Sequence, residues 1–433
     1  MEGRRRKRVA VLSLGTETDV WNAARITAAW GARRDVESVE VIGWDLTHDA
    51  CSLLPGASVV HDLPLAGLRT RAGRHPLAAA IALRGAIDGI IEGRWFDTVL
   101  NLTYGGLAGH LAPLFALDPH AVVGPFVDET GQWRASHPAF EYLATWGLDP
   151  ALNVFSLQDV WSAGAHVRTD EGGHFTADPV ADTLVEHGCG DGAPPIIVAP
   201  TTDAEHWLGF GWEGLVSTLG HAGGRPVMLV APHGEDALVE RIADRTGADV
   251  ARWPLRHRAA LIRRCGAVLT SDFSTSVFAA RAGVKQLLLR REGTIPLASL
   301  PGPHILSMSG EARPLHLDAV LTFAMWHLLQ RQTPEPTLQN SGSGLAIHEI
   351  GYDNSGCLAA TPVASRQPPT HAETLRAWRR IWRDAWVNLP PRPADVEQVL
   401  RHGSSNRLNR ARVDRGRVGE ALRAAARASE AAA

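Results

Sequence analysis

Residues 261–283 read LIRRCGAVLTSDFSTSVFAARAG, and this stretch gives the clearest fold signal in the chain. The apolar run at 267–271 predicts a buried strand, which passes through small hydroxyl residues into a helical pattern at 275–282. A strand, a short turn and a helix in this order form the repeating unit of parallel α/β sheets. We therefore expect an α/β fold.

The same unit recurs on both sides of this stretch, in two series. We expect strands at 8–15, 36–45, 96–103 and 121–124, and then at 195–200, 226–232, 248–253, 267–271 and 285–290. Helical patterns lie between these strands, for example at 20–30 and 76–91. Near-continuous apolar strands separated by helices are typical of parallel sheets covered on both faces. The sequence thus predicts two doubly wound, Rossmann-like parallel-sheet domains that face each other across a cleft.

A stretch rich in Gly, Asp and Thr, about 166–195, separates the two series and predicts a linker. We expect an N-terminal domain at 1–185, a C-terminal domain at 190–332 and a C-terminal extension at 333–433. Within the extension, residues 371–387 carry apolar side chains at helical spacing. We expect that helix to pack back on the core.

Composition excludes several classes of protein. The chain has 433 residues and a formal net charge of −3, which argues against nucleic acid as the main ligand. Its four cysteines lie far apart without metal-ligand spacing, so we expect no metal site and a reducing, cytoplasmic location. No apolar stretch is long enough to span a membrane, while peripheral contact with a membrane surface stays open.

In the first domain, the candidate chemistry lies in the turns that follow two strands. Thr16, Thr18 and Asp19 follow the first strand, where Asp19 is a candidate general base and Thr18 or Asp19 is equally a candidate helix cap. Gly105 and Gly106 follow the strand at 96–103. They allow either close approach of an acceptor substrate or close helix–sheet packing.

In the second domain, three turns are candidates for binding a diphosphate or a ribose. The residues are Thr201 and Thr202, then Glu235 and Asp236, then Asp272, Ser274, Thr275 and Ser276. A helix start offers free N–H groups and a positive dipole end to phosphates. The alternative is ordinary helix capping, with acids in the first turn favoured by the dipole.

Several familiar motifs are absent or misplaced. No G-x-x-x-x-G-K-[ST] phosphate loop and no G-x-S-x-G nucleophile elbow is present. Residues 209–214 match G-x-G-x-x-G, but they lie well past their strand and carry bulky side chains, which argues against a nicotinamide fingerprint.

Taken together, these segments resemble the family 9 glycosyltransferases, which include heptosyltransferases of lipopolysaccharide assembly, from about residue 8 to 303. Residues 96–103 (FDTVLNLT) resemble the family's "FDLVVNLT" strand, and 261–283 resemble its "ALIAGADLVVSVDTGLSHLAAALG" segment. Residues 8–20, 153–160 and 201–212 are similar to three further family segments.

The resemblance implies a GT-B fold and an inverting, metal-independent glycosyltransferase without a resident cofactor. The C-terminal domain would hold a nucleotide-diphosphate sugar as co-substrate, and the N-terminal domain would hold an acceptor hydroxyl. That hydroxyl could belong to a lipopolysaccharide-like glycan, a metabolite or a protein. Asp19 matches the family's catalytic aspartate. The diphosphate would bind around Ser274, Thr275 and Ser276, with Asp272 shaping the turn. Thr201 and Thr202 would approach the phosphates, and Glu235 or Asp236 would reach the ribose.

The sequence departs from the family pattern at four places. Residues 272–274 (DFS) stand where the family has "DTG", and Thr18 replaces the glycine that usually precedes the aspartate. Glu205 or His206 stands where the family has a phosphate-binding lysine, and Val277 replaces its histidine. An anion beside a diphosphate weakens binding unless an arginine compensates. A non-catalytic sugar-nucleotide binding protein and a GT-B nucleotide-sugar epimerase therefore remain alternatives.

Overall fold

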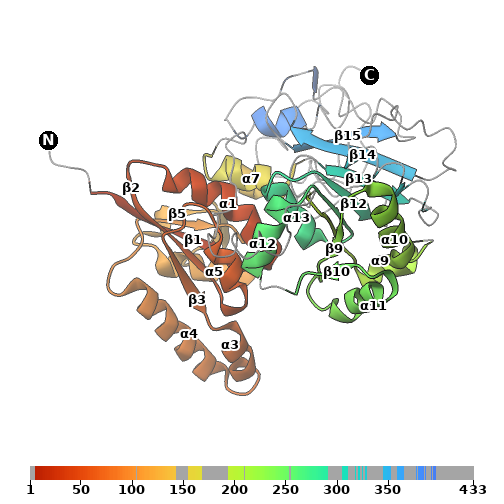
Figure 1. Ribbon diagram of the computed structural model, residues 1–433. Coiled ribbons are helices and arrows are strands. Elements are labelled where there is room, and N and C mark those ends of the chain that lie inside the picture. The colour runs from red at the N-terminus through yellow and green to blue at the C-terminus, as the bar shows by residue number, and fades with distance from the viewer. Residues whose placement is uncertain are drawn as a thin grey trace.

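The protein forms two α/β domains, the first red to yellow and the second green in Figure 1. The computed structural model describes residues 5–103, 105–142, 155–167, 194–208, 210–252, 255–290, 305–310, 345–352 and 358–364. It also describes single positions between 317 and 328 and between 377 and 395. Most of the expected linker lies outside these residues, as do large parts of the C-terminal extension.

The first domain is built on a five-stranded parallel sheet with the order β3-β2-β1-β4-β5. Its strands are β1 Lys7–Ser13, β2 Val36–Trp44, β3 Val59–Leu63, β4 Thr98–Asn101 and β5 Val122–Val123. The central strand β1 is buried on both faces from Val9 to Leu12, as its unbroken apolar sequence predicts. A small antiparallel hairpin follows, formed by β6 Pro125–Val127 and β7 Trp133–Ala135.

Helices cover both faces of this sheet. They are α1 Glu17–Gly31, α2 His48–Ser52, α3 Leu65–Ala72, α4 Pro76–Ile91, α5 Gly106–Phe115, α6 Pro138–Tyr142 and α7 Leu157–Gly164. Two short 3₁₀ turns, η1 Asp45–Thr47 and η2 Pro119–Ala121, connect them. The sequence patterns found α4 at its observed bounds. They missed β3, an edge strand that contains His61 and Asp62 and is only partly buried.

The second domain has a sheet with the order β10-β9-β8-β11-β12-β13-β14-β15. Its parallel strands are β8 Ile196–Ala199, β9 Val227–Leu229, β10 Asp249–Val250, β11 Ala267–Thr270, β12 Gln286–Arg290 and β13 Ile305–Gly310. The helices are α9 Thr202–Trp207, α10 Trp212–Gly223, α11 Asp236–Thr246, α12 Leu255–Arg264 and α13 Phe273–Arg281. Both domains therefore have the doubly wound architecture that the sequence predicts.

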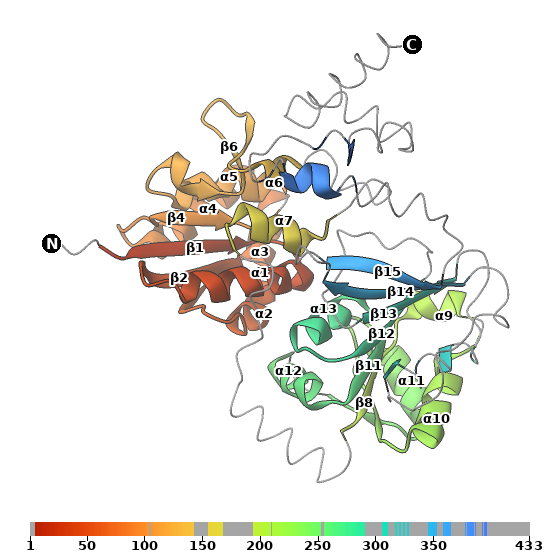
Figure 2. The same ribbon diagram turned by 90° about the horizontal axis from the view of Figure 1, so that it is seen from above.

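The C-terminal part of the chain extends the second sheet. Strands β14 Leu345–Tyr352 and β15 Leu358–Ala364 form an antiparallel hairpin, and β14 pairs with β13 (Figure 2). The expected boundary at residue 332 therefore does not separate this hairpin from the second domain. Residues 333–369 carry few apolar runs, so their strand signal in the sequence was weak. No helix among the described residues is long and apolar enough to cross a membrane.

One of the hydrophobic core clusters spans both domains. Helix α1 packs against α13, and the rings of Trp21 and Phe278 lie 5.0 Å apart between centroids. The two side chains are 1% and 3% exposed. Helix α12 also contacts α2, and a single cluster of buried apolar residues runs through both domains. The arrangement of the two sheets is therefore fixed by apolar packing.

A helical segment near the C-terminus returns to the first domain. Its described residues include Ile381, Trp382 and Trp386, all buried. Trp382 lies 5.2 Å from Tyr142, and Trp386 lies 4.3 Å from Phe155, between ring centroids. In the first domain, Tyr142 is the last residue of α6, and Phe155 lies two residues before the start of α7. We call these four rings the aromatic clasp, because they tie the chain's end to its first half.

Candidate functional site

Asp19 lies at the carboxyl end of the first sheet, in the first turn of α1. Its Oδ2 accepts hydrogen bonds from the backbone N–H of Thr16 (2.7 Å) and from the Thr16 hydroxyl (3.0 Å). Thr16 is the N-cap, and α1 begins at Glu17, which is three residues earlier than the sequence pattern suggested. The carboxylate therefore closes a capping box. The side chain of Thr18 lies outside the described residues.

Gly15 makes room for this carboxylate. A Cβ atom at Gly15 would lie 2.0 Å from Oδ2 of Asp19 and 2.7 Å from its Cβ. Any other residue at this position would displace the Asp19 side chain. Just before Gly15, the Leu14 N–H donates to the Thr103 hydroxyl at 2.7 Å, which links the turn after β1 to the turn after β4.

Gly105 and Gly106 start α5 beside this turn. A Cβ atom at either position would meet nothing within 4 Å, so close helix–sheet packing does not explain these glycines. Packing instead involves Gly109, whose Cβ would lie 3.5 Å from Val127. The start of α5 thus leaves open space next to the β1 turn.

In the second domain, hydrogen bonds join the turns after β8, β9 and β11. The Thr201 hydroxyl lies 2.9 Å from the Ser271 hydroxyl, and it caps α9 by accepting from the Ala204 N–H at 3.2 Å. Glu235 accepts from the backbone N–H of Thr202 at 3.1 Å and from its hydroxyl at 2.6 Å. Residues of these turns that the sequence predicts to bind the nucleotide-sugar donor therefore lie together at one edge of the sheet.

The turn before α13 differs in detail from the sequence-based expectation. Asp272 caps the helix by accepting from the Thr275 N–H at 2.6 Å, and the Ser276 N–H donates to the Asp272 carbonyl at 3.1 Å. The Ser276 hydroxyl is fully buried and donates to Gln286 Oε1 at 2.6 Å. Asp272 shapes this turn, whereas the N–H groups of Thr275 and Ser276 and the hydroxyl of Ser276 already have partners inside the protein.

Glu205 has a cationic partner that the sequence did not reveal. The Arg241 guanidinium contacts both carboxylate oxygens of Glu205, at 2.5 and 2.6 Å, and also reaches Glu213 at 3.0 Å. The hydrogen bond from Glu205 raises the pKa of Arg241 above its ordinary value. Arg241 lies on α11, far from Glu205 in the sequence, so only the packing of α9, α10 and α11 brings the charges together.

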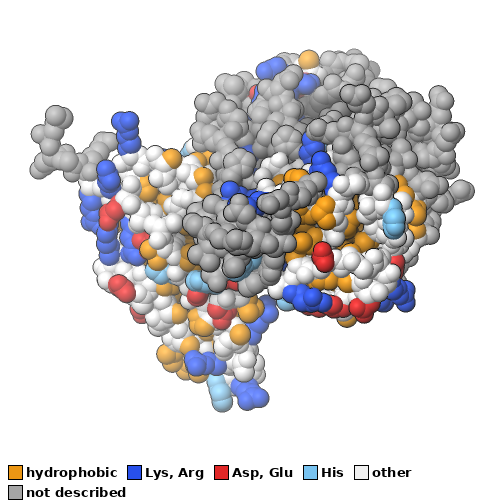
Figure 3. All heavy atoms as spheres, in the orientation of Figure 1, with side chains coloured by type: hydrophobic (Ala, Val, Ile, Leu, Met, Phe, Trp, Pro, Cys, Tyr) orange, Lys and Arg blue, Asp and Glu red, His pale blue; other side chains and the backbone are white. Residues whose placement is uncertain are grey.

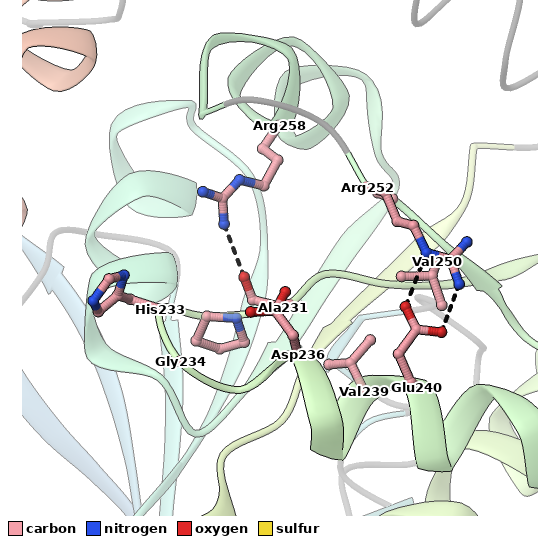
Figure 4. A pocket seen from close by; sticks show the side chains of 11 residues that line it. Ala231, His233, Gly234, Asp236, Val239, Glu240, Val250, Arg252 and Arg258 are labelled. Atoms are coloured by element: carbon pink, nitrogen blue, oxygen red, sulfur yellow. Dashed lines mark hydrogen bonds and ion pairs between the residues drawn. The ribbon is translucent and has the colours of Figure 1, made fainter.

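A pocket of about 370 Å³ opens at the carboxyl ends of β9 and β10. Asp236 and Arg258 line it, and Arg258 reaches across from α12 to donate to the Ala231 carbonyl at 2.8 Å (Figure 4). On the opposite wall, Arg252 and Glu240 form an ion pair at 2.5 Å. Arg258 was not expected from the sequence, where it appears as one arginine among several on a polar helix face.

Comparison of the sequence with known proteins gives no match to a family model and none to a curated protein. Solved structures do match. A glycosyl transferase family 9 structure from Veillonella parvula DSM 2008 aligns with 76% of this chain and 99% of its own, at 14% identity and a TM-score of 0.54. The E. coli ADP-heptose LPS heptosyltransferase II aligns with 75% of this chain and 100% of its own, at 13% identity and a TM-score of 0.52.

The chain has the GT-B fold seen in these family 9 glycosyltransferase structures. The resemblance seen in the sequence is thereby confirmed at the level of the fold. In a doubly wound α/β sheet, ligands bind outside the carboxyl ends of the strands. Asp19 and the three joined turns of the second domain all lie at such ends.

The contact between α1 and α13 brings the carboxyl edges of the two sheets toward each other. Asp19 lies two residues before Trp21, and Asp272 lies six residues before Phe278. At about 1.5 Å of rise per residue, both turns lie within roughly 10 Å along their helices of the same ring contact. Among the described residues, no group of three or more His, Cys, Asp or Glu side chains is placed to hold a metal ion.

Proposed function

We propose that this protein is an inverting, metal-independent glycosyltransferase that uses a nucleotide-diphosphate sugar. The observation that carries the proposal is the joining of the turns at Thr201, Thr202 and Glu235, beside the pocket, in a GT-B fold. These turns supply hydroxyls and a carboxylate, which are groups that hydrogen-bond phosphates and ribose. The pocket at β9 and β10 would take the nucleoside.

In this proposal, Asp19 acts as the general base. The acceptor hydroxyl gives its proton to the Asp19 carboxylate while its oxygen bonds to the anomeric carbon. The bond from that carbon to the diphosphate oxygen breaks, and the nucleoside diphosphate leaves with the electron pair. The cap leaves lone pairs on the carboxylate, because a carboxylate offers about four acceptor positions and Thr16 uses two. The open space at Gly105 and Gly106 would admit the acceptor.

We propose that Arg258 supplies the positive charge that a family lysine gives elsewhere. Glu205 is neutralised by Arg241, and Arg252 by Glu240, whereas Arg258 hydrogen-bonds the neutral carbonyl of Ala231. Its charge is therefore available to the diphosphate of a nucleotide whose nucleoside occupies the pocket. A charge-assisted hydrogen bond contributes about 1.5–3 kcal/mol, or roughly ten- to a hundredfold in affinity.

Binding and turnover measurements test these roles separately. Isothermal titration with a panel of nucleoside diphosphates and nucleotide sugars should identify one tight ligand. For that ligand, Arg258→Gln should weaken binding by at least about tenfold. Arg263→Gln, which removes a charge from the exposed last turn of the same helix, should change it by less than about threefold. If no member of the panel binds, the glycosyltransferase proposal fails.

Asp19→Asn then separates an enzyme from a non-catalytic binding protein. The cap itself supports a non-catalytic binding protein, because it gives Asp19 a structural role that needs no catalysis. Asparagine keeps an acceptor oxygen for the cap but cannot take a proton. Loss of a general base lowers the rate by about 10²–10⁴. A binding protein would show ligand affinity in both forms and sugar transfer in neither, with any acceptor offered.

A further inference from the structure

Helix α3 and the first part of α4, up to Ile87, lie at one side of the first domain (Figure 1). We define these residues, 65–87, as the arm; Asp88 and the last turn of α4 follow it. The two helices pack against each other. No residue of α3 is buried, and α4 buries only Ala79, Ile87, Ile90 and Ile91. Much of the arm's surface is thus in contact with solvent.

The first two turns of α4 are apolar on every side. Residues 76–83 read PLAAAIAL, and among them only Ala79 is buried. Leu77 and Ile81 are 75% and 65% exposed, and they lie four residues apart on the same face of the helix. A helix that is apolar all round is ordinarily buried, so this end of α4 is built to contact something other than water.

The charge of the arm has one sign. Residues 65–87 contain four arginines and neither Asp nor Glu. Arg84 pairs with Asp88 just beyond the arm, at 2.9 Å. Arg69, Arg71 and Arg74 are exposed and form no ion pair with the described residues. These three arginines lie in and just after α3, immediately before the apolar start of α4.

Among the described residues, large apolar side chains that are exposed occur only in the domain that carries the arm. Of the described residues, the large apolar side chains that are exposed all lie between Leu46 and Trp133, and none lies in the second domain. Figure 3 shows this face, with apolar and basic atoms side by side at the lower end of the first domain. The asymmetry is not expected of a protein surrounded evenly by water.

We infer that the arm docks on a membrane surface with anionic headgroups. Aliphatic side chains beside arginines, with no carboxylate among them, match an interface of acyl chains and phosphates. Leu77 and Ile81 would enter the acyl boundary while Arg69, Arg71 and Arg74 contact the phosphates. A second copy of the chain fits this surface poorly, because two such arms would bring like charges together.

Vesicle sedimentation with the full chain tests this inference. The probes are vesicles of phosphatidylcholine alone and of phosphatidylcholine with phosphatidylglycerol. The wild type should bind the anionic vesicles, and binding should weaken in high salt. Replacing three arginines at about 1 kcal/mol each, in Arg69→Gln/Arg71→Gln/Arg74→Gln, should weaken binding by roughly a hundredfold. Leu77→Ser/Ile81→Ser should weaken it by at least about tenfold.

Matched variants control for loss of charge and of apolar surface elsewhere. Arg34→Gln/Arg263→Gln/Arg264→Gln removes the same charge from other exposed positions. Leu117→Ser replaces a leucine that is 65% exposed, at the far end of α5. Both control proteins should bind like the wild type. All substituted positions are exposed, and circular dichroism checks that each protein is folded.

Three outcomes would overturn the inference. The first is a wild-type protein that does not bind anionic vesicles. The second is arm and control variants that lose binding equally, which would indicate general charge attraction. The third is a wild type that dimerises in analytical ultracentrifugation, ignores vesicles and becomes monomeric on Leu77→Ser/Ile81→Ser. That result would assign the arm to a second copy.

Discussion

Replacing Gly15 with alanine should disturb the turn that holds Asp19. The new Cβ would lie 2.0 Å from Oδ2, 2.5 Å from Cγ and 2.7 Å from Cβ of Asp19. Rotation of the aspartate side chain relieves the first two contacts but not the third, so the backbone of the turn must also shift. The variant therefore loses the capping box and strains the start of α1.

The loss in the free energy of unfolding follows from these two effects. Loss of an N-terminal cap costs about 1 kcal/mol, and crowding of a packed site costs about 1–3 kcal/mol. We expect Gly15→Ala to lower the free energy of unfolding by about 2–4 kcal/mol. Asp19→Gly, which loses the cap and places glycine in a helix, should lower it by about 2 kcal/mol.

A double-mutant cycle isolates the contact itself. Asp19→Gly removes all three crowded atoms, so adding Gly15→Ala to that variant should cost little. The coupling between the two changes should then be about 2–4 kcal/mol. Urea unfolding followed by circular dichroism measures each variant. The control is Gly106→Ala, where the Cβ meets nothing and alanine favours the helix, so stability should rise by about 0.4–1 kcal/mol.

An additive cycle would refute this reasoning. If Gly15→Ala costs the same free energy with and without the Asp19 side chain, the carboxylate does not lie over Gly15. In the proposed enzyme, Gly15→Ala should also reduce sugar transfer as strongly as Asp19→Asn, because it moves the base. A Gly15→Ala protein that shows the coupling yet has normal turnover would exclude Asp19 as the base.

Three further predictions concern other parts of the chain. Burial raises the pKa of Glu40, but hydrogen bonds from His61, Arg8 and Ser38 outweigh it and lower that pKa from 4.5 to about 2. The ionised form of Glu40 therefore stabilises the folded protein by about 3 kcal/mol, and this stabilisation is complete above pH 4.5 and lost as the pH falls toward 2. The loss of unfolding free energy caused by Glu40→Gln should shrink over that pH range. A loss that does not change with pH would contradict the prediction. Trp386→Ala should lower the free energy of unfolding by about 3–5 kcal/mol because it empties part of the aromatic clasp, and a loss below about 1 kcal/mol in thermal unfolding would show that the clasp is loose. Gly106→Leu should raise the acceptor KM without changing donor affinity in titration, since its side chain would fill the open space at the start of α5; an unchanged KM would place the acceptor elsewhere.

Local sequence patterns were sufficient for most of the fold. Unbroken apolar runs such as Val9–Leu12 need cover on both faces, which specifies a parallel sheet, and amphipathic stretches such as Pro76–Ile91 specify the helices between them. The hairpin of β14 and β15 was not predicted, because its pairing partner β13 lies some forty residues earlier in the sequence and strand pairing is not a local property.

The sequence by itself determined the two-domain α/β architecture and the positions of the candidate turns, because strand and helix periods and turn residues are local. Only the tertiary structure decided which of those residues are available to a ligand. Ser276 is bonded to Gln286, and Glu205 is neutralised by Arg241, through contacts between elements distant in the chain. Arg258 reaches the pocket and Gly15 lies under Asp19 for the same reason. The charge and the free space at a site depend on which side chains are brought together by packing. A local sequence pattern does not contain that information.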